Sequence, residues 1–382
     1  MKRALILALG TALCTSGMAL AASTTPAKPA ADPTIEQPGW KAPRNEFGQP
    51  DFSGYWTNAT LTPLARNPRL SNSATLPPAE AKALEATFAA ALDEANKPTD
   101  PNAAVKAPSG DSKLTTLRPE FAAAGGDVGG YNAGWLDPGN HIMEVNGEYR
   151  TSLLTTPNGQ VPPRKGQTGT PAAFRGGLGS FDSYETRSLG ERCIMGFGRN
   201  AGPPMLPNGF YNNDYYIIQT PDTVAIQVEL VHDYRIIRLN GKHRTDGVRP
   251  WMGDSIGHFE GDTLVVETTN FPREMQLNGS WKNLKVTEWF KRVSPTRINY
   301  RFQVEDPDTW DKPWGGEYDF APMQGIIYEY ACHEGNYALP SMLAGARRQE
   351  KEAAAASTSA PAPAPTQPSA PAKANGKPGA TR

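Results

Sequence analysis

The chain has 382 residues and a formal net charge of −1, with 38 basic and 39 acidic residues of both signs scattered along it. This balance leaves no basic stripe for nucleic acid and no polybasic patch for a membrane surface, so we expect neither partner. After the N-terminal segment, no stretch approaches the roughly 20 continuous apolar residues of a membrane helix.

Residues 1–22 are typical of a cleaved secretory signal peptide. Two basic residues precede the apolar run ALILALGTAL, and the small residues of Ala19-Leu20-Ala21 follow it. Cys14 raises the alternative of a lipid anchor, but the run TALC lacks the small residue expected before a lipidated cysteine. We therefore expect export to the periplasm or beyond.

Removal of the signal peptide leaves two cysteines, Cys193 and Cys332. In an oxidising compartment their natural state is one disulfide. The alternative, a catalytic thiol, would require one of them to stay reduced outside the cytoplasm. The predicted bond closes a loop of about 140 residues, for which the chain-entropy model gives an upper figure on the order of 4 to 5 kcal/mol, from which strain in the folded state subtracts.

The chain divides by composition into a few segments. Residues 23–50 are rich in Pro, Ala and Thr and predict an extended lead-in. Residues 351–382 are predicted as a disordered Pro/Ala-rich tail, since its part from 357 to 382 has too few apolar side chains to order itself. Between them, residues 51–350 predict a single domain with an insertion at 66–130. The insertion holds a helix at 77–97, where Leu84, Phe88 and Leu92 recur at helical spacing, and a short helix from 341 to about 356 ends the domain.

Residues 214–271 carry the clearest structural pattern of the sequence, that of an antiparallel β-meander. From 223 onward the even positions are apolar and most odd positions polar, the period of a strand with one buried face. Asn240-Gly241 predicts a hairpin turn, and Glu260-Gly261-Asp262 predicts a second reversal. We expect consecutive hairpins of the strands 223–231, 233–239, 254–259 and 263–270.

Similar patterns elsewhere extend the sheet. Strands are predicted at 141–145 and 149–154 around an Asn146-Gly147 turn, and at 285–292, 298–304 and 325–332. Many short strands without βαβ alternation predict a mainly β protein, and closure into a barrel removes the edge strands. The Gly54-x-Trp56 motif resembles the first strand of lipocalin-like barrels, where the Trp closes one end; an ordinary first strand with a buried Trp is the alternative.

Longer motifs resemble those of a large family of secreted bacterial proteins. They are DFSGYW, YNAGW, YRTSLLTTPNGQVPP, ERCIMGFGRNAGPPMLPNGFYNN, VELVHDYRIIRLNGKHR, MGDSIGHFEGDTLVVETTNF and YEYACHEGNY. The resemblance implies export and a lipocalin-like β fold, and it supplies no reaction, cofactor or catalytic set. Relatives commonly read Arg-Trp-Glu-Gly where this chain has His258-Phe259-Glu260-Gly261, so the resemblance implies no shared role for His258.

Strand direction suggests a candidate site. If the four central strands form consecutive hairpins, the reversal at 231–233 and the turn at 260–262 lie at one end of the barrel, and His232, Asp233, Glu260 and Asp262 converge there. An imidazole beside a carboxylate suits general acid-base chemistry near neutral pH. We predict His232 and Glu260 as catalytic residues. The alternative is that the acidic residues are solvated turn residues, since turns select Asp and Gly for conformational reasons.

Five further residues are candidates for ligand binding. Asp233, Arg235 and Asp254 belong to the same strands, and His333 and Glu334 follow the last predicted strand. The latter two reach the same end of the barrel only if 315–321 is not a strand, because an additional crossing would reverse the chain.

We expect no metal and no cofactor. Cys332-His333-Glu334 lacks the three or four ligands of a zinc site and forms no HExxH motif. The run Gly253-Asp254-Ser255-Ile256-Gly257 lies between two predicted strands, whereas a serine-hydrolase elbow joins a strand to a helix, so we interpret it as a turn.

The sequence thus predicts an extracytoplasmic β-barrel that binds a small hydrophobic or aromatic molecule. A metal-independent lyase, isomerase or hydrolase that uses His232 and Glu260 is one alternative, and a structural envelope protein whose tail contacts the cell wall is another. A binding protein or an enzyme requires a cavity, whereas the structural role requires none.

Overall fold

A computed structural model describes residues 39–95, 137–166, 181–196, 202–207, 211–231 and 233–359. All described residues belong to one compact unit, which lies within Pro33–Arg382. The predicted signal peptide at 1–22, the lead-in up to residue 38, the part of the insertion from 96 to 130 and the tail from 360 onward lie outside the described residues.

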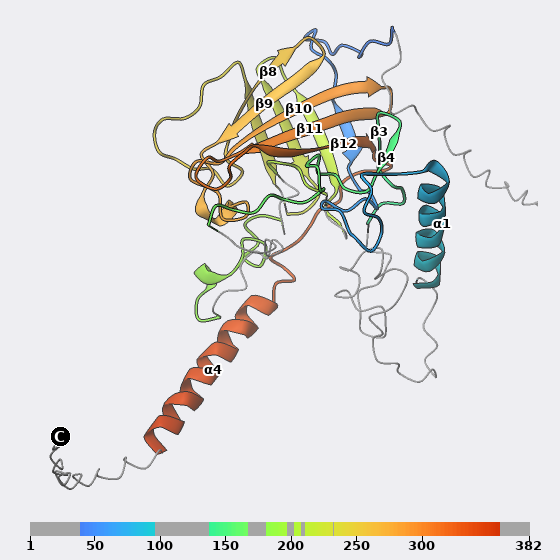
Figure 1. Ribbon diagram of the computed structural model, residues 1–382. Helices are drawn as coiled ribbons and strands as arrows, with labels where there is room; N and C mark the ends of the chain where they lie inside the picture. The colour runs from blue at the N-terminus through green and yellow to red at the C-terminus, as the bar shows by residue number, and fades with distance from the viewer. Residues whose placement is uncertain are drawn as a thin grey trace, which may run out of the picture. The chain divides into compact units, whose positions relative to one another are not determined.

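Nine of the described strands close into a barrel in the order β1-β12-β11-β10-β9-β8-β7-β6-β5 (Figure 1). The fold is therefore the predicted mainly β, lipocalin-like barrel with a helical insertion and a C-terminal helix. The barrel strands are β1 (Gly54–Thr57), β5 (Asp214–Gln219), β6 (Thr223–Val228), β7 (Tyr234–Leu239), β8 (Asp254–Glu260), β9 (Thr263–Thr269), β10 (Lys285–Ser294), β11 (Arg297–Glu305) and β12 (Trp314–Pro322).

The smaller elements lie between and after the barrel strands in the sequence. They are the strands β2 (Thr75–Leu76), β3 (Glu144–Val145) and β4 (Glu148–Arg150), the helices α1 (Pro78–Ala95) and α4 (Ala338–Ser359), and the 3₁₀ helices Tyr184–Thr186 and Arg273–Met275. The three strands form a second sheet in the order β2-β4-β3. Asn146 and Gly147, both with positive φ, make the predicted turn between β3 and β4. Helix α1 buries Phe88 in a small apolar cluster with Leu61 and Leu76.

Side chains at every second strand position fill the barrel interior. The buried positions of β6 and β11 are those that the sequence marked as apolar, including Ile226 and Phe302. Tyr300 contacts four other rings, at centroid distances from 4.9 to 6.0 Å for Phe290, Phe302, Tyr318 and Phe320. Each such ring contributes about 1.5–3 kcal/mol by leaving water. The interior is a packed core of aromatic side chains.

Trp56 occupies the predicted position in the first strand. It is buried, its Nε1 donates to the carbonyl oxygen of Phe52 at 2.9 Å, and the guanidinium of Arg292 lies 5.4 Å from its ring centroid. Arg292 also donates to the carbonyl oxygen of Asp51. This cluster joins the entry to β1 to β10.

One predicted strand connection is wrong. β7 and β8 are paired in parallel, with Ile237 opposite Ser255, whereas the other neighbouring pairs of described barrel strands are antiparallel. Asn240 has the positive φ of a turn residue, but its N–H bonds to the carbonyl oxygen of Gly257. The chain then crosses back through residues 241–253, and Asp254, the first residue of β8, accepts a hydrogen bond from the Arg244 N–H of this loop. The hairpin at 260–262 is confirmed, with Gly261 at φ 60° between antiparallel β8 and β9.

The last barrel strand also differs from the prediction. β12 closes the barrel, and residues 325–332 are not a strand. Because of Gly315 and Gly316, β12 lacks the alternation that predicts a strand. Close packing requires both glycines: a Cβ on Gly315 would lie 2.0 Å from the Phe302 carbonyl oxygen, and one on Gly316 would lie 2.6 Å from the Leu153 carbonyl oxygen. The run Gly253–Gly257, which the sequence predicted as a turn, belongs to strand β8 from Asp254 onward.

Folded residues continue beyond both predicted ends of the domain. Residues 39–50 are folded, since Arg44 and Pro50 form a β-bridge and Gln49 donates to the carbonyl oxygen of Thr220. At the other end, α4 includes the predicted helix from 341 to about 356 and extends beyond it in both directions. Among the described residues, no helix is both long and apolar enough to cross a membrane.

Candidate functional site

The predicted convergence of Asp233 with Glu260 is contradicted by the strand directions. Asp233 precedes β7 and Glu260 ends β8; since these strands are parallel, the two residues lie at opposite ends of the pair. The Asp233 carboxylate accepts a hydrogen bond from the Gly196 N–H at 2.8 Å, and exposed Glu260 contacts the His258 Nε2 at 3.0 Å. His232 lies outside the described residues, so its catalytic role stays a prediction without this geometric support.

Asp254 has a clear structural environment. It is buried and accepts hydrogen bonds from the Arg244 N–H and the Arg238 side chain, each at 2.7 Å, and contacts the His243 ring. Burial raises its pKa, but these hydrogen bonds and positive charges outweigh burial and hold the pKa below its usual value. Asp254 therefore fixes the loop that makes β8 parallel to β7.

Arg235 lies inside the barrel rather than at its end. Its guanidinium pairs with both carboxylate oxygens of Glu288, and it also donates to Ser255 and Thr268. Both members of the ion pair are almost completely buried. Tyr300 donates its hydroxyl proton to Glu288 at 2.7 Å.

The segment Gly202–Pro207 extends this interior network through Met205. The Met205 N–H donates to the Tyr300 hydroxyl at 2.9 Å, and its carbonyl oxygen accepts from Tyr318 and from Asn58. Met205 itself is fully buried. Burial, together with the neighbouring charge of Glu288, raises the pKa of Tyr300. The interior is thus occupied by the protein's own backbone, rings and a neutralised charge pair.

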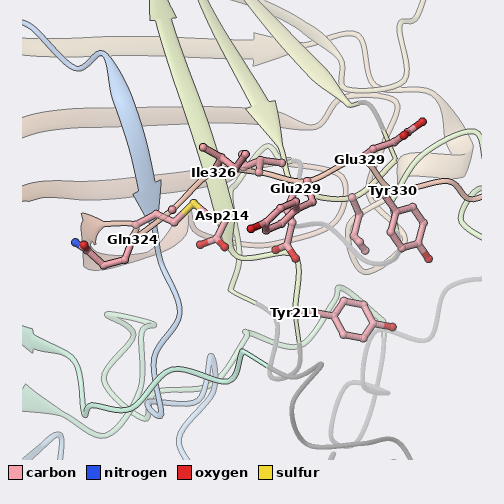
Figure 2. A pocket seen from close by; sticks show the side chains of 12 residues that line it. Tyr211, Asp214, Glu229, Gln324, Ile326, Glu329 and Tyr330 are labelled. Carbon is pink, nitrogen blue, oxygen red and sulfur yellow. The ribbon is translucent and has the colours of Figure 1, made fainter. Parts of the chain in front are cut away.

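A cavity lies instead on the outer wall, where β5 begins and β6 ends. It has a volume of about 440 Å³ and is lined by Asp214, Glu229 and Leu230, by Tyr211, and by residues 323–330 (Figure 2). Asp214 and Glu229 alternate with the buried Tyr215 and Val228, so they face away from the barrel interior. We call this cavity the lateral cleft.

The two carboxylates of the lateral cleft share one low-dielectric site. Burial, followed by the charges of Glu229 and Asp137, raises the pKa of Asp214 to about 7, against a hydrogen bond from Thr57. Burial also raises the pKa of Glu229, although the Asn213 N–H donates to it at 3.0 Å. Within the described part of the chain, neither carboxylate forms a salt bridge with a cation. Their charges are therefore not neutralised by described side chains.

Residues 323–337, which we call the strap, cover the lateral cleft. The strap is fixed at one end by the Met323 N–H bonding to the Tyr55 carbonyl oxygen at 3.1 Å, and at the other by the Cys193–Cys332 disulfide. Beyond the disulfide, Asn336 donates to the carbonyl oxygen of Glu191 at 2.8 Å. The predicted disulfide is thus confirmed, and it anchors the cover of a cavity.

The strap reaches the cleft although 315–321 is part of a strand. The last residues of β12 pair with the last residues of β1, Ala321 opposite Thr57, and Thr57 also pairs with Asp214. This stagger delivers the strap directly to the start of β5. His333 and Glu334 are exposed just beyond Cys332 and do not line the cleft.

No arrangement suited to a metal ion occurs in the described ranges: no group of three or more His, Cys, Asp or Glu side chains could hold one. Sequence reasoning missed Asp214 and Glu229, because each occupies a polar, outward position in a regular alternation. The strap sequence could have indicated the site, because its Ile and Tyr residues suggest that this segment packs against another part of the protein.

Fold and site define a closed β-barrel protein with a disulfide-anchored strap over a lateral cleft. The disulfide indicates an oxidising environment, outside the cytoplasm. No family model and no curated protein matches the chain. Among solved structures, the crystal structure of a mutant of the fluorescent protein UnaG is similar at a TM-score of 0.20 and 12% identity, covering 29% of this chain and 72% of that one.

Proposed function

We propose that this is an extracytoplasmic protein that binds a small hydrophobic or aromatic molecule in the lateral cleft. The observation that carries the proposal is a pair of partly buried carboxylates, Asp214 and Glu229, that line a mostly apolar cavity without a cationic partner among the described residues. The predicted signal peptide at 1–22 supports export. The packed interior argues against the barrel lumen as the binding site.

The lining specifies the chemistry of the ligand. Tyr211, Tyr328 and Tyr330 supply aromatic rings, and Ile326 and Leu230 supply aliphatic surface. Two neighbouring carboxylates repel each other when both are ionised, and a cation between them removes that cost. Aromatic rings also attract cations through their faces. The ligand is therefore an apolar or aromatic body that carries a protonated amine.

Calorimetric titration with three naphthalene derivatives tests this proposal. Naphthylmethylamine is expected to bind, naphthylmethanol to bind at least about tenfold more weakly, and naphthoate not to bind in this cleft, because only the amine is cationic. Affinity for the amine should rise from pH 5 to pH 8, as Asp214 with its pKa of about 7 ionises.

The double variant Asp214→Asn with Glu229→Gln should remove the preference for the amine while keeping size and hydrogen bonding. Glu274→Gln is the matched control, because Glu274 is exposed and does not line the cleft. Equal affinity for amine and alcohol in the unmodified protein would refute the proposed ligand class.

An acid-base enzyme is a second candidate, favoured by the pKa of Asp214 near 7 beside a second carboxyl group. A lyase, isomerase or hydrolase could use one carboxyl group as acid and the other as base. Substrate turnover that is lost in Asp214→Asn and has a pH optimum near 7 would favour this function over simple binding. The cleft itself favours either function over a purely structural envelope role.

A further inference from the structure

A second cavity lies on a different part of the barrel wall, where β10, β11 and the start of β12 run side by side. Its volume is about 430 Å³, and its lining includes Trp289, Arg301, Gln303, Pro313 and Trp314. None of these residues lines the lateral cleft. Trp289 and Arg301 are opposite one another in the β10–β11 pairing, so both side chains stand on the same face.

Arg301 gives this cavity its charge. Among the described residues that line it, Arg301 is the only ionisable one. Its guanidinium lies 4.1 Å from the ring centroid of Trp289, stacked on the indole face. Within the described ranges it has no carboxylate partner and no hydrogen bond, although Glu317 is its neighbour in the register and bonds instead to Asn299. The stacked guanidinium keeps its donors free for a planar anion.

Gln303 stands two residues from Arg301 on β11, so both side chains are on the same, outward face. The Gln303 side-chain amide has no hydrogen bond to the described residues. The indole of Trp314 is on the other face: Trp314 is opposite the buried Val304, and its ring packs against Phe302 and Trp310.

We infer that this cavity, the tryptophan–arginine cavity, is a binding site for a small aromatic carboxylate. The carboxylate pairs with Arg301 and accepts a further hydrogen bond from the Gln303 amide, and the aromatic ring packs against Trp289 and Pro313. The site is independent of the lateral cleft and has the opposite charge preference. The protein would then hold a cationic and an anionic aromatic molecule at two separate places on the barrel.

Calorimetric titration of the disulfide-bonded protein with naphthoate tests the inference, with naphthylmethanol as the neutral comparison. Naphthoate should bind at least about tenfold more tightly than the alcohol, because charged hydrogen bonds are lost in the alcohol. Arg301→Gln should remove this difference, and Arg301→Lys should restore part of it by keeping the charge without the fork. Gln303→Leu, which removes the amide at a similar size, should weaken naphthoate more than naphthylmethanol.

Arg348→Gln is the matched control, because Arg348 is an exposed arginine of α4 with a neighbouring partner, Glu352. Thermal unfolding of Arg301→Gln should match that of the unmodified protein, since the side chain is exposed and makes no hydrogen bond to the described residues. Naphthoate binding that is absent at millimolar concentration, equal to that of the alcohol, or unchanged in Arg301→Gln would overturn the inference. The Asp214→Asn, Glu229→Gln variant should leave naphthoate affinity unchanged, which separates this outcome from that of the lateral cleft.

Discussion

The barrel interior and the lateral cleft both remove ionisable groups from water, but they do so in opposite ways. Inside, Arg235 and Glu288 neutralise each other, and Ser255, Thr268 and Tyr300 complete their hydrogen bonds. In the cleft, Asp214 and Glu229 have the same sign, and burial raises the pKa of each. In the interior, the two charges neutralise each other. In the cleft, no described cation neutralises the two carboxylates, so their charge is available to a bound ligand. We therefore assign a structural role to the interior ion pair and a binding role to the cleft carboxylates.

Breaking the interior pair should produce the largest effect. Glu288→Gln leaves the buried Arg235 without its counter-charge, and loss of one partner of a buried ion pair costs about 3–5 kcal/mol. Urea denaturation should show a loss of unfolding free energy of that size.

The double variant Arg235→Met with Glu288→Leu should be closer to the unmodified protein, because apolar side chains of similar size remove both charges at once. A loss below about 1 kcal/mol in Glu288→Gln would mean that the pair is more hydrated than the packed interior implies.

Removing the disulfide should have the next largest effect and should join the two regions. Cys193→Ser with Cys332→Ser frees a loop with a sequence separation of 139, for which disulfide loss costs about 2–4 kcal/mol. Because the same bond anchors the strap, amine affinity in the lateral cleft should fall even under conditions where the barrel stays folded. Unfolding free energy is read from urea denaturation and affinity from calorimetry. Unchanged amine affinity in the folded variant would show that the strap holds its position without the bond.

Neutralising Asp214 should have the smallest effect on stability, and its sign depends on pH. The folded-state pKa of about 7 exceeds the ordinary value of 3.8, so the folded state holds the proton more tightly than the unfolded state. Stability from this group is complete below about pH 4 and is lost as pH rises through about 7.

Asp214→Asn should therefore be more stable than the unmodified protein at pH 8 and nearly equal to it at pH 4. The difference between a pKa of 3.8 and one of about 7 corresponds to about 4 kcal/mol, which solvent screening at a partly exposed group reduces to about 1–2 kcal/mol. Thermal unfolding at both pH values measures this difference, with Glu274→Gln as the control. A variant that is less stable than the unmodified protein at pH 8 would mean that the ionised Asp214 is already compensated.

The sequence predicted a barrel because several of its strands, unlike β12, alternate between buried and more exposed side chains. Alternation in β6 and β11 identifies strands and their inner residues directly. Alternation does not identify the neighbour of a strand, so the parallel pairing of β7 with β8, which depends on hydrogen bonds to Asp254, could not be predicted. The Ile326, Tyr328 and Tyr330 alternation predicted a strand, whereas these residues belong to the strap.

The candidate site was harder to predict than the fold. The disulfide followed from cysteine number and compartment, but its function as an anchor required the position of the strap. Asp214 and Glu229 resemble any solvated polar residues of a sheet, and only the stagger between β12 and β1 places the strap above them. The grouping of Asp233 with Glu260 failed for another reason: it assumed that β7 and β8 form an antiparallel hairpin, whereas they are parallel.

Methyl NMR of the two regions gives the most direct test of where the ligand binds. Met323 lines the lateral cleft and Met205 is fully buried in the interior, so methionine-methyl labelling places one probe in each. During titration with naphthylmethylamine, the Met323 resonance should shift and the Met205 resonance should stay unchanged. A shift of Met205 with none at Met323 would place the ligand inside the barrel and contradict the assignment of binding to the lateral cleft.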